Sequence, residues 1–212
     1  MRRLIWFAFG LLFMTACASG PDLNFSRTTA VKVSSGFGHG SGTLISPTEI
    51  LTARHVVRAG ETLLIEFYTG TLTSAKVTYM GEHDDAAILT LEKPQRYFSA
   101  IDCRPLKLGE KVYTLGNPEF LRFMYTEGVI ADSGELGMQE AMLPPGMPED
   151  VARMVLVSAN WEPGDSGAAV FDMHGKVRGV VSIVFNTDRG GISNNSLITP
   201  VTVLPACKGR TA

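Results

Sequence analysis

The sequence predicts an all-β protein, because short β-rich runs and turn residues alternate along most of its length. The runs are rich in Val, Ile, Thr and aromatic residues, and Gly, Ser and Pro separate them. Few stretches place apolar residues at helical spacing over a useful length. The expected strands cover residues 30–34, 42–45, 49–52, 63–67, 75–80 and 87–91 in the first half, and 111–115, 124–130, 155–158, 168–171, 177–183 and 197–200 in the second.

Residues 1–20 have the layout of a secretory signal rather than of a membrane span. Arg2 and Arg3 precede an apolar run over 4–14, and small residues follow that run. The run is shorter than the roughly 20 residues that a membrane-spanning helix needs. We therefore expect an exported protein of the bacterial cell envelope.

Two interpretations of the cleavage site remain open. The segment Met14-Thr15-Ala16-Cys17 resembles a bacterial lipobox, in which Cys17 becomes the lipidated first residue. The segment Ala16-Cys17-Ala18 also fits ordinary signal peptidase, which gives a periplasmic or secreted protein. We favour the lipoprotein, because it gives Cys17 a purpose. Because Ala18 rather than Asp follows the cysteine, resemblance to sorted lipoproteins implies an outer-membrane anchor facing the periplasm.

Charge and length narrow the function classes. The formal net charge of -2 argues against a general binder of nucleic acids or of anionic membranes. After removal of the signal, the chain is long enough to fold as one compact unit or two small lobes. No spacing of ligand residues indicates a metal site, and we expect no cofactor. Membrane contact is expected only through the N-terminal lipid anchor, and the sequence does not define the oligomeric state.

Cys103 and Cys207 are the cysteines that remain once the N-terminal segment is removed. An even pair in an oxidising compartment favours a disulfide. Closing this long loop stabilises the fold by about 4 to 5 kcal/mol in the chain-entropy model. Two buried free thiols are an equally weighted alternative.

A single hydroxyl is presented at the apex of the turn Gly164-Asp165-Ser166-Gly167, whose glycines free the backbone. A serine hydroxyl becomes a useful nucleophile only beside a general base that a third group orients. Ser166 as a nucleophile therefore requires a histidine and a carboxylate elsewhere in the chain. His55, which follows the expected strand 49–52, suits the role of the base.

Asp85 is the favoured carboxylate, because the apolar residues 87–89 mark it as the residue that enters a buried strand. Its neighbour Asp84 is the alternative, and the nearby His83 leaves a metal cluster as a further alternative. His39 and His174 lie in Gly-rich turn contexts, so we expect both at the surface rather than as ligands.

The blocks Thr52-Ala53-Arg54-His55, Asp85-Ala86-Ala87-Ile88-Leu89 and Gly164-Asp165-Ser166-Gly167 stand in the order His, Asp, Ser. This ordered set resembles the trypsin-like (chymotrypsin-fold) serine proteases, and the short core is similar to bacterial HtrA-type peptidase domains without a PDZ domain. The resemblance implies two six-stranded antiparallel β-barrels with the active site in the cleft between them. The expected lobes cover residues 21–104 and 105–212.

The same resemblance implies a serine endopeptidase that acts on proteins or peptides through an acyl-enzyme. His55 accepts the proton of Ser166, and Asp85 fixes the tautomer of His55. The backbone N–H groups of Gly164 and Ser166 are the expected oxyanion hole. The alternative is a protease-fold binding protein, or a switch-activated protease, in which the oxyanion hole is collapsed.

Specificity is also inferred from the resemblance. Asn160, six residues before the nucleophile, is expected at the base of the pocket for the side chain preceding the cut, where a neutral amide does not favour Arg or Lys. The segment Val181-Ser182-Ile183 is expected to pair with substrate backbone. Residues 133–153, rich in Met, Pro and Gly, are long for a connection and are either a gate beside the oxyanion turn or a surface insertion.

Overall fold

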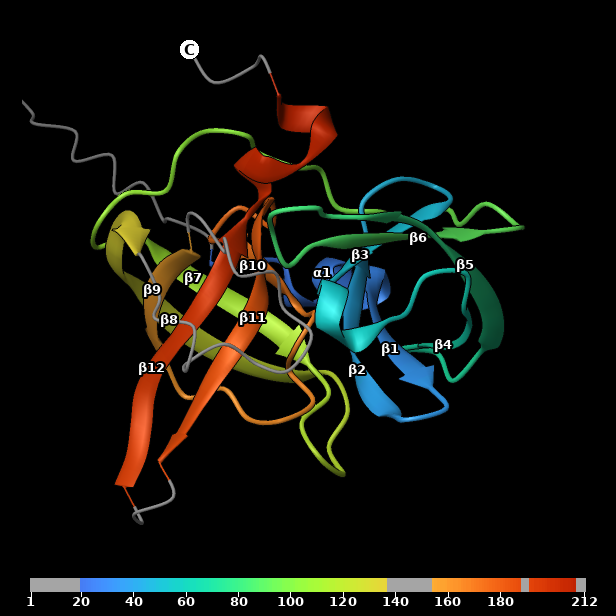
Figure 1. The fold of residues 1–212 in the computed structure, drawn as a ribbon, viewed down its shortest axis with the longest axis horizontal. Coiled ribbons are helices and arrows are strands. Elements are labelled where there is room, and N and C mark those ends of the chain that lie inside the picture. Colours follow the sequence, from blue (N-terminus) through green and yellow to red (C-terminus); the bar gives the residue numbers. More distant parts are fainter. Residues whose placement is uncertain (1–19, 137–153, 188–190, 209–212) are drawn as a thin grey trace, which may run out of the picture.

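The computed structural model describes residues 20–136, 154–187 and 191–208, and its strands close into two antiparallel barrels side by side (Figure 1). Six strands close each barrel, in the orders β1-β2-β3-β6-β5-β4 and β10-β11-β12-β9-β8-β7. The expected all-β, two-barrel fold is therefore confirmed. The first barrel comprises β1 (Ala30–Ser35), β2 (Gly38–Leu44), β3 (Glu49–Thr52), β4 (Thr62–Phe67), β5 (Leu72–Met80) and β6 (Ala87–Leu91). The second comprises β7 (Lys111–Gly116), β8 (Met124–Leu136), β9 (Met154–Ala159), β10 (Ala169–Asp172), β11 (Val177–Thr187) and β12 (Gly191–Pro200).

The helical segments are short and were not expected from the apolar pattern. Helix α1 (Leu23–Thr29) begins where the Asp22 carboxylate accepts a hydrogen bond from the Phe25 N–H at 3.0 Å, which satisfies one of the free donors of the first turn. The other helical turns in the described part of the chain are the 3-10 segments η1 (Arg54–Val56), η3 (Val201–Val203) and η4 (Pro205–Cys207). Among the described residues, no helix has the length and apolar character to cross a membrane.

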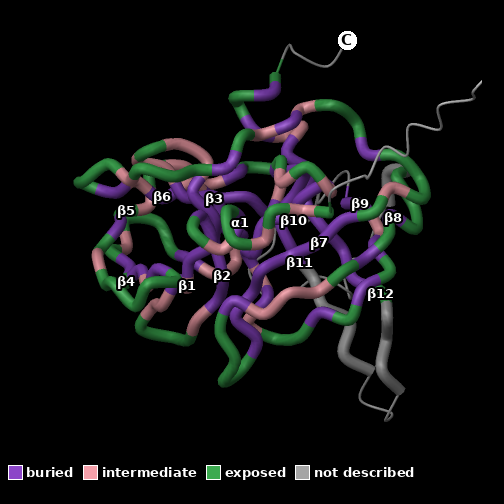
Figure 2. Tube along the Cα trace, turned by 180° about the vertical axis from the view of Figure 1, so that it is seen from behind, coloured by how far each residue is buried: buried purple, intermediate pink, exposed green. Residues whose placement is uncertain are grey.

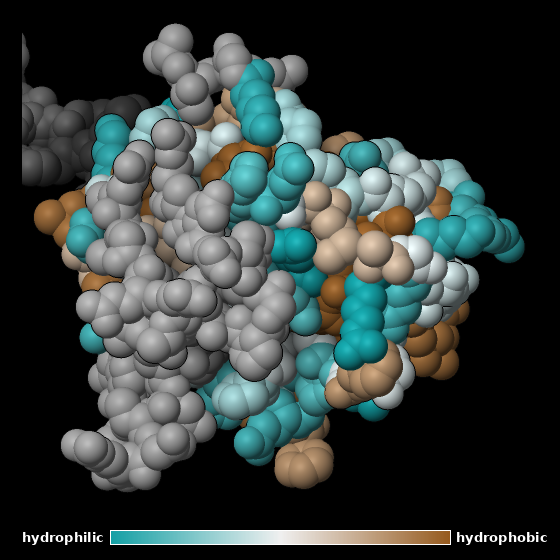
Figure 3. All heavy atoms as spheres, viewed as in Figure 1, coloured by the Kyte–Doolittle hydropathy of each residue, from teal (hydrophilic) through white to brown (hydrophobic). Residues whose placement is uncertain are grey.

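Each barrel has its own apolar interior, because alternate residues of a strand face the same side. In β4, Leu63, Ile65 and Phe67 are buried, whereas Leu64 between them is exposed. Figure 2 shows the same concentration of buried residues along the strands, with exposed residues in the connections. On the face in Figure 3, apolar residues of the first barrel lie among hydrophilic ones.

A further apolar cluster joins the two barrels. Leu51 and Ala86 of the first barrel pack in the same cluster as Tyr113 and Phe171 of the second. Cys207 belongs to this cluster, and the Cα atoms of Cys103 and Cys207 are 5.3 Å apart with their sulfur atoms at bonding distance. The packing fixes the orientation of the barrels, so residues from both can meet at one site.

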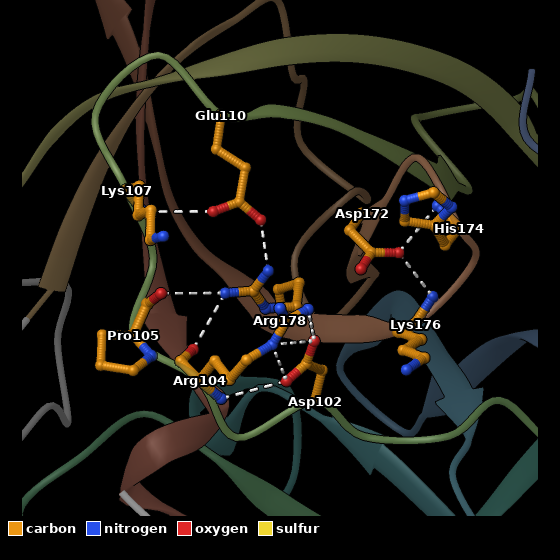
Figure 4. A network of polar contacts seen from close by, with 9 residues as sticks. All are labelled: Asp102, Arg104, Pro105, Lys107, Glu110, Asp172, His174, Lys176 and Arg178. Atoms are coloured by element: carbon orange, nitrogen blue, oxygen red, sulfur yellow. Dashed lines mark hydrogen bonds and ion pairs between the residues drawn. The ribbon is translucent and has the colours of Figure 1, made fainter. Parts of the chain in front are cut away.

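The connection between the barrels, which runs from Leu91 to Lys111 and contains the expected lobe boundary, is held by a polar network (Figure 4). The buried Arg178 forms an ion pair with Glu110, and its Nη2 donates to the carbonyl oxygens of Arg104 and Pro105 at 2.9 and 3.1 Å. These bonds tie the connection to β11.

Some sequence expectations fall on segments outside the described residues. They concern the signal-type segment with Cys17, and residues 137–153 of the long Met-rich segment. Residues 133–136 of that segment continue β8.

Candidate active site

His55 and Asp85 meet at the edge of the first barrel because of strand order. Strands β3 and β6 are antiparallel neighbours with Thr52 opposite Ala87, so the short segment after β3, which carries His55, lies beside the short segment before β6, which carries Asp85. The Asp85 carboxylate is 1% exposed and accepts two hydrogen bonds from His55, one from the backbone N–H at 2.9 Å and one from Nδ1 at 2.8 Å.

This geometry defines the tautomer of His55. A carboxylate only accepts hydrogen bonds, so Nδ1 carries the proton and the neutral ring keeps Nε2 as an acceptor. The hydrogen bond from the His55 backbone N–H to the same carboxylate fixes the position of the ring relative to the barrel. The neighbouring Asp84 accepts instead from the Ala86 N–H at 3.2 Å, so the geometry favours Asp85 as the carboxylate that orients His55.

The Ser166 turn is held against the first barrel by close backbone contacts. The Ser166 carbonyl accepts from the Ser41 N–H of β2 at 2.8 Å. A Cβ on Gly40 would lie 2.8 Å from the Ser166 carbonyl oxygen and 2.9 Å from Val56, the residue after His55. Gly40 therefore lies between the two segments and lets them approach. Among the described residues, the Ser166 hydroxyl has no hydrogen-bond partner, and serine-to-base contacts are often loose in unliganded enzymes.

Gly167 is required by its surroundings as well as by its backbone angles. Its φ is +87°, and a Cβ there would lie 2.2 Å from the Ser41 carbonyl oxygen. Its N–H donates to the Val181 carbonyl at 2.8 Å, which ties the turn to β11. Glycine therefore permits the turn to contact both barrels at once.

The peptides before Ser166 are held by hydrogen bonds to their carbonyl groups. The Pro163 carbonyl accepts from the Glu119 N–H at 3.0 Å, and the Gly164 carbonyl accepts from the Ser41 hydroxyl at 2.8 Å. In a trans peptide the N–H points opposite to the C=O, so the Gly164 N–H points away from Glu119. Within the described part of the chain, the N–H groups of Gly164 and Ser166 donate to no other group, so both are available to a ligand.

Asp165 is a buried carboxylate beside these donors. One of its oxygens accepts from the Glu162 N–H at 3.0 Å, and the other lies where a Cβ on Gly116 would be 1.9 Å away. No Lys or Arg of the described chain forms an ion pair with it. Burial raises the pKa of Asp165 to about 6.

The residues expected to bind substrate lie in varied environments. Asn160 is exposed, Val181 is buried, and the buried Ser182 hydroxyl lies 2.7 Å from the Thr199 hydroxyl. The backbone of Ile183 pairs with Leu197 of β12, and its side chain lies outside the description. Along its other edge, β11 pairs with β10 only as far as Val180, so the edge after Val181 is open within the described strands.

Three polar residues at the site were missed or misjudged from the sequence. His39, expected at the surface, is half-buried with Nε2 3.0 Å from the Asn117 carbonyl oxygen and close to Gly164. Ser41 and Asn117 contact the Ser166 turn and each other. The Gly-rich context of His39 resembled a turn, although Gly40 and Gly42 serve close packing in β2. His174 is exposed, as expected. In the described residues, no group of three or more His, Cys, Asp or Glu could hold a metal ion.

Curated relatives match most of this chain. A protein named probable periplasmic serine endoprotease DegP-like, from Pseudomonas savastanoi pv. phaseolicola, is 29% identical over 166 residues, which cover 77% of this chain and 33% of that protein. The Escherichia coli periplasmic pH-dependent serine endoprotease DegQ is 23% identical over 159 residues, with coverage of 73% and 33%. The chain therefore spans about one third of the length of these relatives.

Solved structures share the fold. The active form of the Rv3671c protease from M. tuberculosis superposes with a TM-score of 0.73 at 25% identity, covering 90% of this chain and 88% of that one. The HtrA-type protease AlgW with a tripeptide has a TM-score of 0.70 at 19% identity, covering 86% and 61%. Residues 40–180 match the family model described as the trypsin-like peptidase domain. With most of its length matched, this chain belongs to the trypsin-like peptidase family.

Proposed function

We propose that the protein is a serine endopeptidase whose catalytic residues are His55, Asp85 and Ser166. The observation that carries this proposal is the pair of hydrogen bonds from His55 to the buried Asp85 carboxylate. They leave Nε2 as the free nitrogen of the ring, in a segment against which the Ser166 turn is packed. The relatives, which are named serine endoproteases, support the same reaction.

The proposed reaction proceeds in two halves. The Ser166 Oγ attacks the scissile carbonyl carbon while His55 Nε2 takes its proton, and the Asp85 carboxylate stabilises the resulting imidazolium. The tetrahedral intermediate collapses as the C–N bond breaks, and His55 gives the proton to the leaving amine. Water, deprotonated by His55, then attacks the acyl-enzyme ester and releases the acid and Ser166.

The oxyanion hole of this enzyme is proposed to be assembled before substrate binds. Its donors are the N–H groups of Gly164 and Ser166, which are worth most where they are oriented in advance. The bond from Glu119 to the Pro163 carbonyl supports this state, because a collapsed hole requires that carbonyl to turn inward. The contact therefore argues against the binding-protein and switch-activated alternatives.

We propose that substrates are extended peptide segments that add a strand to the open edge of β11 after Val181. The neutral Asn160 is proposed to disfavour Arg and Lys before the cut. The proposed location is the cell envelope, with Cys17 as the lipid anchor and with Cys103 and Cys207 oxidised to a disulfide. The secretory-type N-terminus and the periplasmic names of the relatives support this location.

Covalent labelling tests the proposed nucleophile. The mature soluble chain is incubated with a fluorophosphonate and measured by intact-protein mass spectrometry beside Ser166→Ala. We expect a single adduct in the wild type and none in the variant, because only an activated serine beside an oxyanion hole reacts. Ser196→Ala is the matched control, since its buried hydroxyl in β12 has no hydrogen-bond partner within the described residues, and it should label like the wild type. Absence of an adduct at neutral pH, or an adduct that persists in Ser166→Ala, would contradict the proposal.

A further inference from the structure

The Ser41 hydroxyl lies where three segments meet: strand β2, the loop after β7 and the Ser166 turn. Ser41 is 0% exposed. Its Oγ donates to the Gly164 carbonyl at 2.8 Å and accepts from Asn117, from the backbone N–H at 2.9 Å and from Nδ2 at 3.0 Å. A hydroxyl has one donor and two acceptor sites, so these bonds use its full capacity.

The chemistry of the partners fixes the direction of every bond. The Gly164 carbonyl can only accept, and the backbone N–H and the side-chain amide of Asn117 both donate. The Ser41 hydroxyl must therefore donate its proton to the Gly164 carbonyl. Asn117 is itself held from both barrels, because Nδ2 lies 3.3 Å from the Val31 carbonyl and Oδ1 accepts from the Phe123 N–H at 3.2 Å. The donor aimed at Gly164 is therefore oriented in advance.

Ser41 also binds the turn through its backbone, since its N–H donates to the Ser166 carbonyl at 2.8 Å. One residue of the first barrel therefore holds the peptide after Gly164 and the peptide after Ser166. The peptide bond from Asp165 to Ser166, which lies between these two, carries the Ser166 N–H. The peptide bond from Pro163 to Gly164, which precedes them, carries the Gly164 N–H. Rotation of either N–H away from the hole requires a held neighbour to move, which costs a buried hydrogen bond.

We propose that Ser41 is a positioning residue for the oxyanion hole, whose hydroxyl holds the Gly164 carbonyl so that the two oxyanion donors stay aimed at the reacting carbonyl. The inference rests on the function proposed above and adds a residue of the first barrel to the machinery of the second. Ser41 touches no substrate atom in this role, and it acts through the turn.

A positioning role has a kinetic signature that a purely structural role lacks. The oxyanion forms only after substrate is bound, in the tetrahedral intermediate and the transition states that flank it, so weaker stabilisation of the oxyanion lowers kcat and leaves KM nearly unchanged. Direct removal of an oxyanion donor costs about 100- to 1,000-fold in kcat. Because Ser41 orients the turn and is not itself an oxyanion donor, we expect Ser41→Ala to lower kcat by a smaller factor, about 10- to 100-fold.

Thr43→Val is the matched control. Thr43 lies two residues along the same strand and is equally buried, and its hydroxyl has no hydrogen-bond partner within the described chain. The control therefore removes a buried hydroxyl of β2 without removing a bond. We expect its kcat, KM and fluorophosphonate labelling to match the wild type.

The test measures kcat and KM for the wild type and both variants, with a casein-derived peptide as the substrate. It also measures the Ki of a peptide aldehyde that has the sequence of this substrate on the N-terminal side of the cut. An aldehyde captured by Ser166 places an oxyanion in the hole, so Ser41→Ala should raise its Ki by the same factor by which kcat falls. Thermal unfolding verifies that each variant is folded at the assay temperature. Where Ser41→Ala is unfolded, Ser41→Cys, which keeps the size and offers only a weak donor, serves in the same assays.

The outcomes separate this inference from the proposed function. A wild type that reacts with no fluorophosphonate overturns both. Labelling of the wild type together with unchanged kcat and Ki in Ser41→Ala overturns the role of Ser41 alone. A rise in KM without a fall in kcat, or an equal loss in Thr43→Val, also overturns it.

Discussion

The two barrels supply the halves of the candidate site in different ways. His55 and Asp85 both belong to the first barrel, and the bonds between them depend only on the pairing of β3 with β6. The Ser166 turn belongs to the second barrel, yet Ser41 of the first barrel holds it together with Glu119 and Val181. The base and its carboxylate are therefore a local property of one barrel, whereas the nucleophile depends on how the barrels meet.

The largest effect is expected within the first barrel, from Asp85→Asn. Loss of the carboxylate removes the acceptor that holds the proton on Nδ1, and the ring then presents the wrong tautomer to Ser166. We expect kcat to fall by about 10,000-fold, the size of loss that this change causes in serine proteases. The measurement is kcat on a casein-derived peptide, with thermal unfolding as a test of folding.

Asp84→Asn is the matched control for that change, because it alters the neighbouring carboxylate, which accepts from the Ala86 N–H rather than from His55. Its kcat should stay within about threefold of the wild type, because Asn keeps a side-chain oxygen that accepts from the Ala86 N–H and both bonds from His55 to Asp85 are untouched. Equal losses of kcat in the two variants would show that kcat depends on the conformation of the turn that contains Asp84 and Asp85, and not on the hydrogen bond from His55 to Asp85.

The proposed disulfide distinguishes the second barrel from the first. The first barrel, residues 30–91, contains no cysteine, whereas the proposed bond between Cys103 and Cys207, with a sequence separation of 104, closes a loop that contains the second barrel. Cys103→Ala combined with Cys207→Ala should lower the free energy of unfolding by about 4 to 5 kcal/mol, measured by urea titration.

Alkylation of the wild type provides the control for this prediction. Under denaturing conditions without reductant, the mature chain should take up no label at Cys103 and Cys207, and with reductant it should take up label at both. Two thiols that alkylate without reductant would mean that the pair is reduced, and the double variant should then lose much less stability.

The sequence predicted the strands well because their burial alternates with period two, as in β4, and because turn residues separate them. It missed α1, since that helix depends on the cap from Asp22 and on packing rather than on an apolar stripe. It also singled out His55 and Asp85, which the structure joins by two hydrogen bonds, and Ser166, whose role as the nucleophile stays a prediction.

The polar contacts that hold the Ser166 turn were beyond sequence reasoning. Ser41 and Asn117 lie 76 positions apart in the chain, and a serine in a Gly-rich run has no pattern that marks it as buried. His39 was misjudged for the same reason, because glycines that permit close packing look like glycines of a surface turn. Long-range register decides these contacts, and the local pattern does not encode it.

The smallest predicted effect compares two buried carboxylates near the second barrel. The Arg104 guanidinium lowers the pKa of Asp102, whereas burial raises the pKa of Asp165 to about 6. Between about pH 4 and 6 the folded protein keeps a proton on Asp165 that the unfolded chain has lost, so its contribution to stability decreases as the pH rises. Above this window the buried charge costs about 3 kcal/mol relative to a neutral group.

Asp165→Asn should remove that cost while its side-chain oxygen still accepts from the Glu162 N–H. In urea titrations, its free energy of unfolding should match the wild type near pH 4 and exceed it by about 3 kcal/mol at pH 7.5. Asp102→Asn should differ in the opposite sense, because the charge of Asp102 stabilises the fold above its unfolded pKa and that stability is lost only as the pH falls. Parallel pH profiles for Asp165→Asn and the wild type would mean that the buried carboxylate has a cationic partner in solution. In that case the Ser166 turn is held by an ion pair, and its dependence on Ser41 is correspondingly weaker.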